Sequence, residues 1–426
     1  MGILTVKEDS LTSIADSIRK KTGKNEKIKF PDGFASAIEG IETGGDEPVQ
    51  AAIEPSDVNF FDYDGTLIAS YSEDEAKVLS ELPTPPAHDG LTLQGWNYTL
   101  DEVKDNADAA DIGALYITDD GKTKLEIETK SNSTILTLNF EQTKSAGVLI
   151  DWGDGNSGRS NANTGINSIT HTYESAGIYE ISLLPDDDCS LKLGYSTVKT
   201  MISGSSILLR NLYTGKNITM FNAGAFSGCY YLEHISMGQG IRVMGEVFSN
   251  CQSLEYITLP RETPSLFVRA FLNCYKIHHI SIAPVLGVMR VACNDCHSLK
   301  RIVLIGDYSV MSDDNSHFTN CSCLEQVVLK TTEKIQLATN MFKNCVTLRR
   351  LKCKADVSVV GGYVLQTSQS IKEIDLSGCT GVPTLTSTNN LPANPYNLTI
   401  IVPASLESLW KSTTNWYVFA DYIKSV

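Results

Sequence analysis

The stretch Phe226-Ser-Gly-Cys229-Tyr-Tyr-Leu232-Glu-His-Ile235-Ser-Met237 decides the fold, because the chain repeats it. Close copies lie at residues 248–259 and 271–282, and looser ones at 296–304, 318–329, 342–353 and 365–376. The period of about 22 to 25 residues is typical of solenoid proteins. One such unit cannot bury its own apolar face, whereas stacked units share one continuous core.

Each repeat divides into two halves. The x-Ile-x-Leu half alternates apolar and polar residues, which predicts a short strand with one buried face. The Phe-x-x-Cys half predicts a helical or irregular turn. The complete pattern resembles the BspA-type leucine-rich repeat rather than the common type with an asparagine ladder. We therefore expect a solenoid over residues 195–426, closed by a cap at 398–426 in which Leu406, Leu409 and Trp410 of an amphipathic helix cover the open end.

Composition narrows the classes of function. The chain has 426 residues and a formal net charge of −15, which argues against nucleic acid and anionic membranes as partners. It holds no apolar run near the ~20 residues that span a bilayer. Its first residues lack the layout of a signal peptide. These features predict a protein that is made in, and stays soluble in, a cytoplasm.

The eleven cysteines are interpreted as buried thiols rather than disulfides or metal ligands. Six occupy one position of the repeat, where a small apolar side chain suffices. Cys293-x-x-Cys296 has metal-like spacing, but no second pair accompanies it at the distance that a zinc site needs. The sequence therefore predicts no metal site.

Residues 1–44 predict two short amphipathic helices, the first with Leu11, Ile14 and Ile18 on one face and the second opened by Pro31. Such helices are marginal alone. They could pack on their own chain or dock to a partner. The paired layout of residues 11–41 resembles the N-terminal segment of tail proteins from tailed bacteriophages.

A linker leads to a small acidic module at residues 56–110. Its Asp62-x-Asp64-Gly65-Thr66 matches the first motif of haloacid-dehalogenase-type phosphatases, in which the first aspartate is the nucleophile. The buried strand before it and the later acidic motif of that family are missing here. A tight Asp-Gly hairpin turn explains the motif better, so the sequence predicts no catalytic residue and no cofactor. The whole segment also resembles a small module of phage tail proteins.

Residues 111–194 show alternating strands separated by Gly and Asn turns. Trp152-Gly-Asp154-Gly, followed by His171-Thr-Tyr173, resembles the polycystic-kidney-disease-type (PKD) domain. That resemblance implies a small immunoglobulin-like β-sandwich that serves as a spacer or adhesion module. Asp151 and Asp154 raise the question of a calcium site, although two acids fall short of the six to eight oxygens that calcium takes.

Outward positions of the repeat strands stack into columns that suggest a ligand-binding strip. A row of histidine, tyrosine and arginine on an acidic protein suits recognition, although a solvated sheet face explains the same residues. A second column contains Ser236, Thr258 and Ser281. The candidate strip is His234, Tyr256, His279, Arg301, Gln326 and Arg350.

Together these segments predict a multidomain, mainly β protein: short N-terminal helices, a small α+β module, an immunoglobulin-like β-sandwich and a C-terminal leucine-rich-repeat solenoid. The resemblances imply a non-enzymatic virion protein of a tailed bacteriophage, made in the bacterial host cytoplasm and associated with the tail or baseplate. Its N-terminal segment would bind other virion proteins, and its repeats a host-surface or mucosal glycan or protein. A head decoration protein and a bacterial surface adhesin are the alternatives, and homo-oligomerisation stays open.

Overall fold

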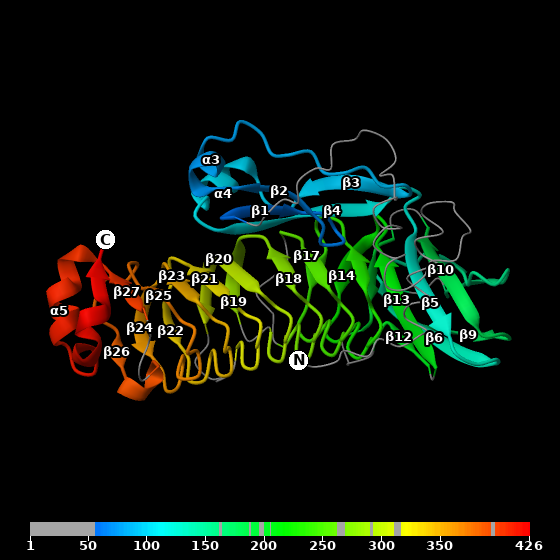
Figure 1. Ribbon diagram of the computed structural model, residues 1–426. Helices are drawn as coiled ribbons and strands as arrows, with labels where there is room; N and C mark the ends of the chain where they lie inside the picture. The colour runs from blue at the N-terminus through cyan, green and yellow to red at the C-terminus, as the bar shows by residue number, and fades with distance from the viewer. Residues whose placement is uncertain are drawn as a thin grey trace, which may run out of the picture. The chain divides into compact units, whose positions relative to one another are not determined.

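The computed structural model describes residues 56–161, 164–186, 189–195, 200–204, 206–261, 269–289, 293–310, 317–392 and 397–426. The chain divides into residues 1–52, which lie outside the described residues, and a compact unit at residues 53–426. The predicted N-terminal helices at 1–44 lie outside the described residues. All described elements belong to the second unit (Figure 1).

Residues 58–118 form a small α+β module around one four-stranded sheet. Its elements are β1 (Val58–Phe61), β2 (Leu67–Tyr71), α3 (Glu73–Lys77), β3 (Leu91–Trp96), α4 (Leu100–Asp105) and β4 (Ala110–Thr118). The strand order is β2-β1-β4-β3, with β1 and β4 parallel and the other pairs antiparallel. Gly65 turns the chain between β1 and β2 at φ 87°, which confirms the Asp-Gly hairpin turn. Because β4 completes this sheet, the module continues past the expected end at residue 110.

The next segment contributes two β-sheets that share one core. Their strands are β5 (Thr123–Thr129), β6 (Thr134–Gln142), β7 (Val148–Asp151), β8 (Ser157–Arg159), β9 (Gly165–Tyr173), β10 (Gly177–Pro185), β11 (Leu191–Leu193), β12 (Ile202–Ser203), β13 (Ile207–Tyr213), β14 (Ile218–Phe221), β15 (His234–Ser236) and β16 (Arg242–Val243). One sheet has the order β15-β13-β5-β10-β7-β8, and the other β12-β6-β11-β14-β16 with β9 paired to β6. Strands after residue 194 thus complete both sheets. The strands of the first repeat, β15 and β16, belong to the same two sheets, so no boundary separates the sheets from the solenoid at residue 194.

The remaining repeats stack their strands in parallel, as the periodicity predicts. Their strands are β17 (Tyr256–Leu259), β18 (His279–Ile282), β19 (Val285–Met289), β20 (Arg301–Val310), β21 (Gln326–Lys330), β22 (Lys334–Leu337), β23 (Arg350–Cys353), β24 (Asp356–Val360), β25 (Glu373–Asp375), β26 (Thr384–Leu385) and β27 (Thr399–Val402). The main sheet runs β19-β20-β21-β23-β25-β27 and ends on β28 (Ile423–Ser425), and β22-β24-β26 form a second, smaller sheet. The Phe-x-x-Cys halves form turns between them.

Phenylalanine rings and cysteine thiols hold successive turns together. The rings of Phe226 and Phe248 stack at 5.9 Å with their planes 6° apart. The Cys251 thiol donates to the backbone carbonyl of Phe226 at 3.2 Å, which satisfies both buried groups. All eleven cysteines are free, and of the repeat column only Cys229 is partly exposed. The same thiol bond to the preceding repeat recurs at Cys274, Cys296, Cys321 and Cys345.

A ladder of asparagine and aspartate side chains, which we call the amide ladder after its four asparagines, runs beside the thiols, although the pattern resembled repeats without one. Its members are Asn250, Asn273, Asp295, Asn320 and Asn344, all with φ between 60° and 64°. Asparagine and aspartate tolerate this left-handed backbone better than most residues. Asn320 Nδ2 donates to Asp295 Oδ1 at 2.7 Å and its Oδ1 accepts from Asn344 Nδ2 at 2.7 Å. The same positions thus form both the turn and the contact between repeats.

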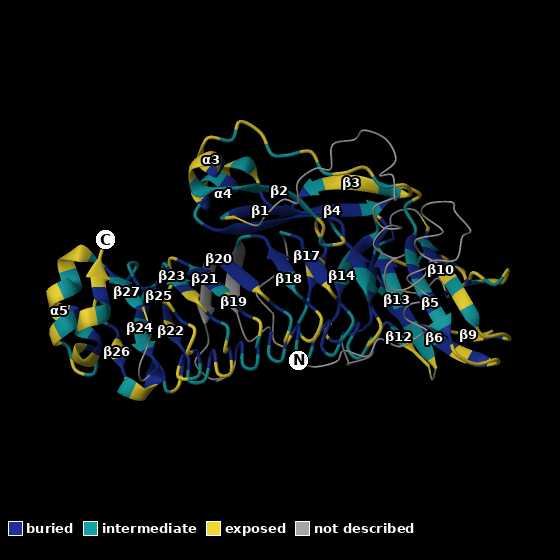
Figure 2. Ribbon diagram, in the orientation of Figure 1, coloured by how far each residue is buried: buried dark blue, intermediate teal, exposed yellow. Residues whose placement is uncertain are grey.

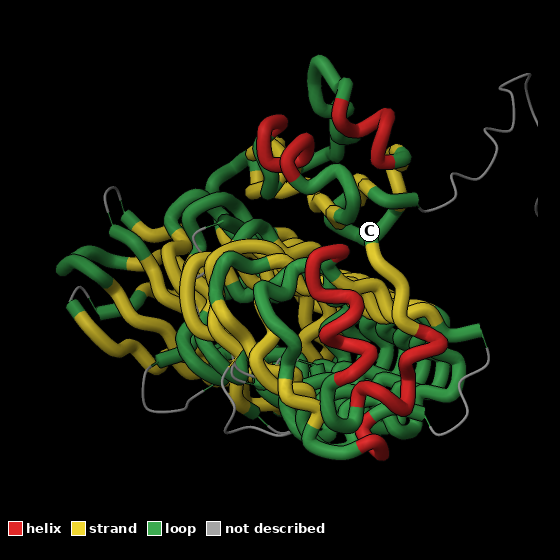
Figure 3. The backbone as a smooth tube through the Cα atoms, turned by 90° about the vertical axis from the view of Figure 1, so that its left-hand side faces the viewer, coloured by secondary structure: helices red, strands yellow, loops and turns green. Residues whose placement is uncertain are grey.

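The C-terminal residues close the solenoid as expected. Strand β27 leads into a 3₁₀ turn (Ala404–Leu406), helix α5 (Glu407–Ser412) and a 3₁₀ helix (Trp416–Tyr422). Figure 3 shows these helices crossing the open end of the stack. Trp410 and Trp416 are fully buried with ring centroids 4.6 Å apart. Leu409, which we expected to help cover the core, is instead 53% exposed, because Trp410 and Trp416 fill the space beneath the helix.

Two hydrophobic cores hold this unit together (Figure 2). The larger runs from the two sheets of residues 123–243 through every repeat to Trp416 in the cap. The smaller lies within the module but includes Val303, Ile305 and Val328 of the solenoid strands. The module is therefore packed against the outer face of the solenoid sheet. Among the described residues, no helix has the length and apolar character needed to cross a membrane.

Candidate functional site

The predicted strip does lie in register along the solenoid strands. Arg301 pairs with Gln326, Gln326 with Arg350, and Arg350 with Glu373 across parallel neighbours. Tyr256 and His279 pair in the same way on β17 and β18. Since side chains alternate along a strand, these positions all point away from the solenoid core. The surroundings of the strip, however, differ from one end to the other.

The module covers the middle of the strip, which corrects the expectation of a continuous open surface. Arg301 is buried and donates to the carbonyl oxygens of Ser56 at 2.8 Å and Asp57 at 2.7 Å. Its guanidinium also lies 3.5 Å from Asp111 Oδ1. Tyr256 is buried beneath Phe61, at 5.7 Å between ring centroids. A long-range contact therefore turns predicted ligand positions into an internal interface.

His279 lies in the same interface. Its ring is 4.5 Å from that of Phe61, and its Nδ1 has no hydrogen-bond partner among the described residues. Burial lowers the pKa of His279, because the charged imidazolium is poorly solvated there. His234 lies half-buried at the first repeat, on β15. These two histidines are thus poor candidates for contact with an external ligand.

The second column of outward positions is covered as well. Ser281 accepts from Asn97 Nδ2 at 3.0 Å and donates to the carbonyl of Asp111 at 2.7 Å. Tyr98 donates its hydroxyl to the carbonyl of Ile282 at 2.8 Å. Thr258 lies so close to Gly113 that an added Cβ there would stand 2.0 Å from its Oγ1. The interface is therefore tight and well hydrogen-bonded.

One feature of the sequence indicates that part of the strand face is covered. Val303 and Val328 occupy outward strand positions where other repeats carry Ser, Thr, Lys or Asp. Both are buried against the module. An apolar residue at a position that should face water indicates a partner surface. The repeat alignment alone could not say that the partner was residues 58–118 of the same chain.

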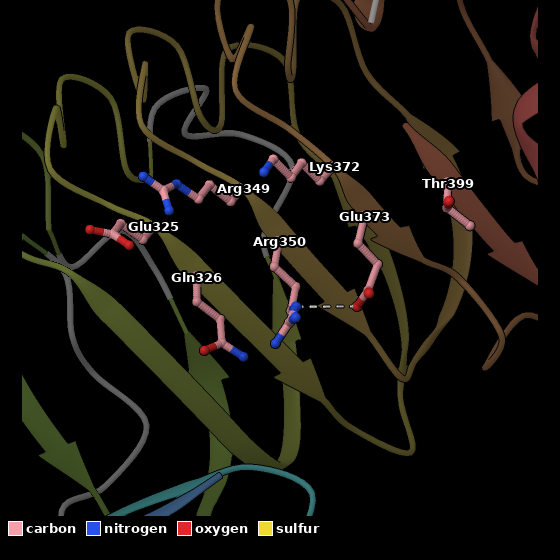
Figure 4. A pocket seen from close by; sticks show the side chains of 7 residues that line it. All are labelled: Glu325, Gln326, Arg349, Arg350, Lys372, Glu373 and Thr399. Carbon is pink, nitrogen blue, oxygen red and sulfur yellow. Dashed lines mark ion pairs between the residues drawn. The ribbon is translucent and has the colours of Figure 1, made fainter. Parts of the chain in front are cut away.

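The strip becomes open at Gln326 and Arg350, where the module ends. A surface hollow of about 440 Å³ lies there (Figure 4). Arg350 points toward Glu373 and pairs with it at 3.5 Å between Nε and Oε1. Arg349 and Lys372, which precede the strands, lie along one side of the hollow. Its lining is Glu325, Gln326, Arg349, Arg350, Lys372, Glu373 and Thr399.

The Asp62 motif builds structure in the module. It directly follows β1, which is a buried strand, so the expectation that no buried strand precedes the motif was wrong. Asp62 is buried, and its Oδ2 lies 2.7 Å from His88 Nε2. Asp64 accepts from the backbone amide of Thr66 at 2.9 Å, as expected of an Asp-Gly turn. Tyr63 packs edge-on against His88, with ring centroids 5.0 Å apart. Both aspartates thus have local partners that fix the hairpin.

The Trp152 motif forms a similar local network between the two sheets. The rings of Trp152 and His171 stack at 4.7 Å, and His171 Nε2 lies 2.7 Å from Asp154 Oδ2. The Tyr173 hydroxyl donates to the carbonyl of Trp152 at 2.9 Å. Asp151 accepts from the amide of Gly153, and Asp154 from that of Asn156. Within the described residues, no group of three or more His, Cys, Asp or Glu side chains could hold a metal ion.

Comparison with known proteins finds similarity to leucine-rich repeat proteins. No curated protein matches the chain. Similar solved structures include a leucine-rich repeat protein from Bacteroides ovatus ATCC 8483, at 16% identity and a TM-score of 0.28 over 51% of this chain and 66% of that one. Another is a leucine-rich cell surface protein from Faecalibacterium prausnitzii A2-165, at 14% identity and a TM-score of 0.19 over 56% of this chain and 90% of that one. Both TM-scores are too low to bear on function. A family model does match: residues 204–314 and 290–389 fit the BspA type leucine-rich repeat region, in six copies.

Proposed function

We propose that this chain is a non-enzymatic adhesin that binds a surface glycan or protein through the part of its solenoid strand face that the module leaves uncovered. The observation that carries the proposal is the polar hollow over Gln326, Arg350 and Glu373. It lies on a rigid stack of parallel strands, and rigid elements position binding groups well. The fit to the BspA-type repeat model supports this class of protein.

The other segments have supporting roles in this proposal. The two sheets at residues 123–243 act as a spacer that carries the repeats, and their shared core with the solenoid supports a stiff connection. Their Trp152 and His171 network supports the PKD-type, immunoglobulin-like identity as a proposal. The module closes off the middle of the strip and limits where a ligand can bind.

Where the adhesin is displayed is a separate proposal. The repeat match favours a bacterial surface adhesin over a virion protein. The phage hypothesis, whether tail or head decoration, rests on residues 11–41 and the module. Residues 11–41 lie outside the described residues. Fractionation separates the two settings: recovery with washed cell envelopes supports the surface adhesin, and recovery only with purified particles supports the virion protein.

A binding screen tests the function itself. The full chain is passed over immobilised host-surface polymers, including mucin, neutral and acidic polysaccharides and extracellular-matrix proteins. We expect retention on at least one of them, reduced by Arg350→Ala and not by Lys343→Ala at an exposed position outside the hollow. Retention on none of the polymers would defeat the proposal. So would phosphatase turnover that disappears in Asp62→Asn.

A further inference from the structure

A second hollow opens on the same face of the solenoid, at the edge of the module. Its volume is about 380 Å³, and both the module helices and the repeat strands contribute to it. Lys77 and Lys104 come from α3 and α4, whereas Lys330 and Lys352 come from β21 and β23. The full lining is Glu73, Lys77, Lys104, Asp105, Ala107, Asp108, Lys330, Lys352 and Lys354.

Strand geometry joins the two hollows into one surface. Arg350 lines the first hollow, whereas Lys352 and Lys354 line the second. These residues are two apart along β23 and its extension, so their side chains point to the same side of the sheet. We call this surface, made of both linings, the basic face. Figure 1 shows the strands that carry it, β21, β23 and β25, below the level of α3 and α4.

The basic face has the opposite charge balance to the rest of the chain. Its two linings hold eight Lys and Arg and five Asp and Glu, whereas the whole chain holds 35 and 50. Several of its cations already have partners, such as Lys354 with Asp375 at 2.6 Å and Lys330 with Asp108 at 3.6 Å. Four of its cations form no ion pair with another described residue: Lys104, Arg349, Lys352 and Lys372. Lys352 donates a hydrogen bond to the carbonyl of Asp108, which leaves Lys104, Arg349 and Lys372 as the charges most available to an anion.

We infer that the basic face binds an acidic polysaccharide, one that carries a carboxylate or sulfate on every one or two sugars. The inference rests on the proposed function and names the ligand class of that site. Arginine forks recognise carboxylate and sulfate oxygens well, and lysines add point charges along the chain. Gln326 and Thr399 offer hydrogen bonds to sugar hydroxyls.

The same surface disfavours other polymers. Neither lining contains an aromatic side chain, so nucleic-acid bases have no flat partner for stacking. A nucleic acid would also bring closely spaced phosphates to a chain of net charge −15. A polysaccharide needs no aromatic partner, and its hydroxyls can use the hydrogen bonds that Gln326 and Thr399 offer. Two separated cationic hollows suit a ligand whose charges are spaced along its length.

Equilibrium binding of the full chain tests the inference. The ligands are polygalacturonate and chondroitin sulfate, with dextran as the neutral polysaccharide and mucin as the glycoprotein. The variant Lys104→Gln/Arg349→Gln/Lys372→Gln removes three of the four charges that form no ion pair. The control Lys216→Gln/Lys343→Gln/Lys424→Gln removes three exposed charges outside both linings, so the net charge of the two proteins is equal.

We expect the first variant to bind the acidic polysaccharides about tenfold more weakly, since each exposed ion pair contributes a modest amount. The control should bind like the native chain, and added salt should weaken native binding. Equal binding by variant and control would overturn the site. Binding to dextran or mucin alone would overturn the inference and leave the proposed function standing. No binding to any of these ligands would overturn the inference, and the wider screen with extracellular-matrix proteins would then decide the proposed function.

Discussion

Arg301 and Arg350 offer a paired test of the cover, because they hold the same position in different repeats. The change is Arg→Met, which removes the charge and keeps most of the apolar stem. Arg301 is buried under the module beside Asp111, whereas Arg350 is exposed beside Glu373. If the module covers the strip, the two variants must differ strongly in stability.

The magnitude depends on what each arginine leaves behind. Removing Arg301 strands the buried Asp111 carboxylate, which still accepts from the side-chain amide of Asn59 at 3.0 Å. Breaking a buried pair from one side lowers the free energy of unfolding by about 3–5 kcal/mol. Ser56 is exposed, so water can replace the bond to its carbonyl. We therefore expect a loss of about 3–4 kcal/mol for Arg301→Met and less than about 1 kcal/mol for Arg350→Met.

Hydrogen exchange locates the effect, because it reports opening of β1 and β4 separately from the repeats. Exchange of these strands should quicken in Arg301→Met and stay near native in Arg350→Met. Adding Asp111→Asn to Arg301→Met should restore part of the stability, since no buried charge is then left unpaired. Equal effects of the two arginine variants would refute the covered interface.

Three further predictions concern the interior. At pH 8, iodoacetamide should label Cys323 at once and the buried column thiols, such as Cys274, only after unfolding. Cys323 is exposed, whereas burial raises the pKa of Cys274 to about 12. Mass spectrometry that finds Cys274 and Cys323 labelled equally would contradict this. Asn320→Ala should lower the free energy of unfolding by about 2 kcal/mol and Asn320→Gly by about 1 kcal/mol. Both variants lose the hydrogen bonds of the ladder, but only glycine adopts the positive φ without strain. Urea denaturation measures the difference. Burial depresses the pKa of His279, so the stability that its neutral form contributes is present above pH ~6.5 and is lost as pH falls through its folded-state pKa. His279→Gln should therefore flatten the fall in stability below about pH 6.5, and an unchanged slope would show that His279 does not control it.

The periodic part of the fold was predictable because its determinants are local. Phe248, Cys251 and Leu254 recur in each copy, and each is buried in the common core. The register of Arg301, Gln326 and Arg350 agrees with the same alignment. Strand pairing between identical units leaves few other arrangements. The amide ladder was also visible as Asn in the copies at 250, 273, 320 and 344, but its positive φ depends on the three-dimensional turn and not on the residue type alone.

The site was only half predictable, because exposure is set by residues far away in the chain. Arg301 contacts Asp57, and the two are 244 residues apart. Nothing in a repeat alignment encodes such a contact. The apolar Val303 and Val328 hinted at a cover, and the module supplied it. The predicted end of the module at residue 110 was wrong for a related reason. The sequence of β4 fits a strand of the module or of the following sheets equally well, and only its pairing with β1 places it in the module.

The module both removes and creates binding surface, and this sets the position of the proposed site. By burying Tyr256 and Arg301 it withdraws the aromatic part of the strip from solvent. By placing Lys77 and Lys104 beside Lys352 it adds cations to the part that stays open. A variant that loosened the module would therefore change ligand preference as well as affinity, exposing Tyr256 for stacking while dispersing the lysines. Arg301→Met tests that coupling: it should weaken binding to polygalacturonate although Arg301 itself lies outside both linings.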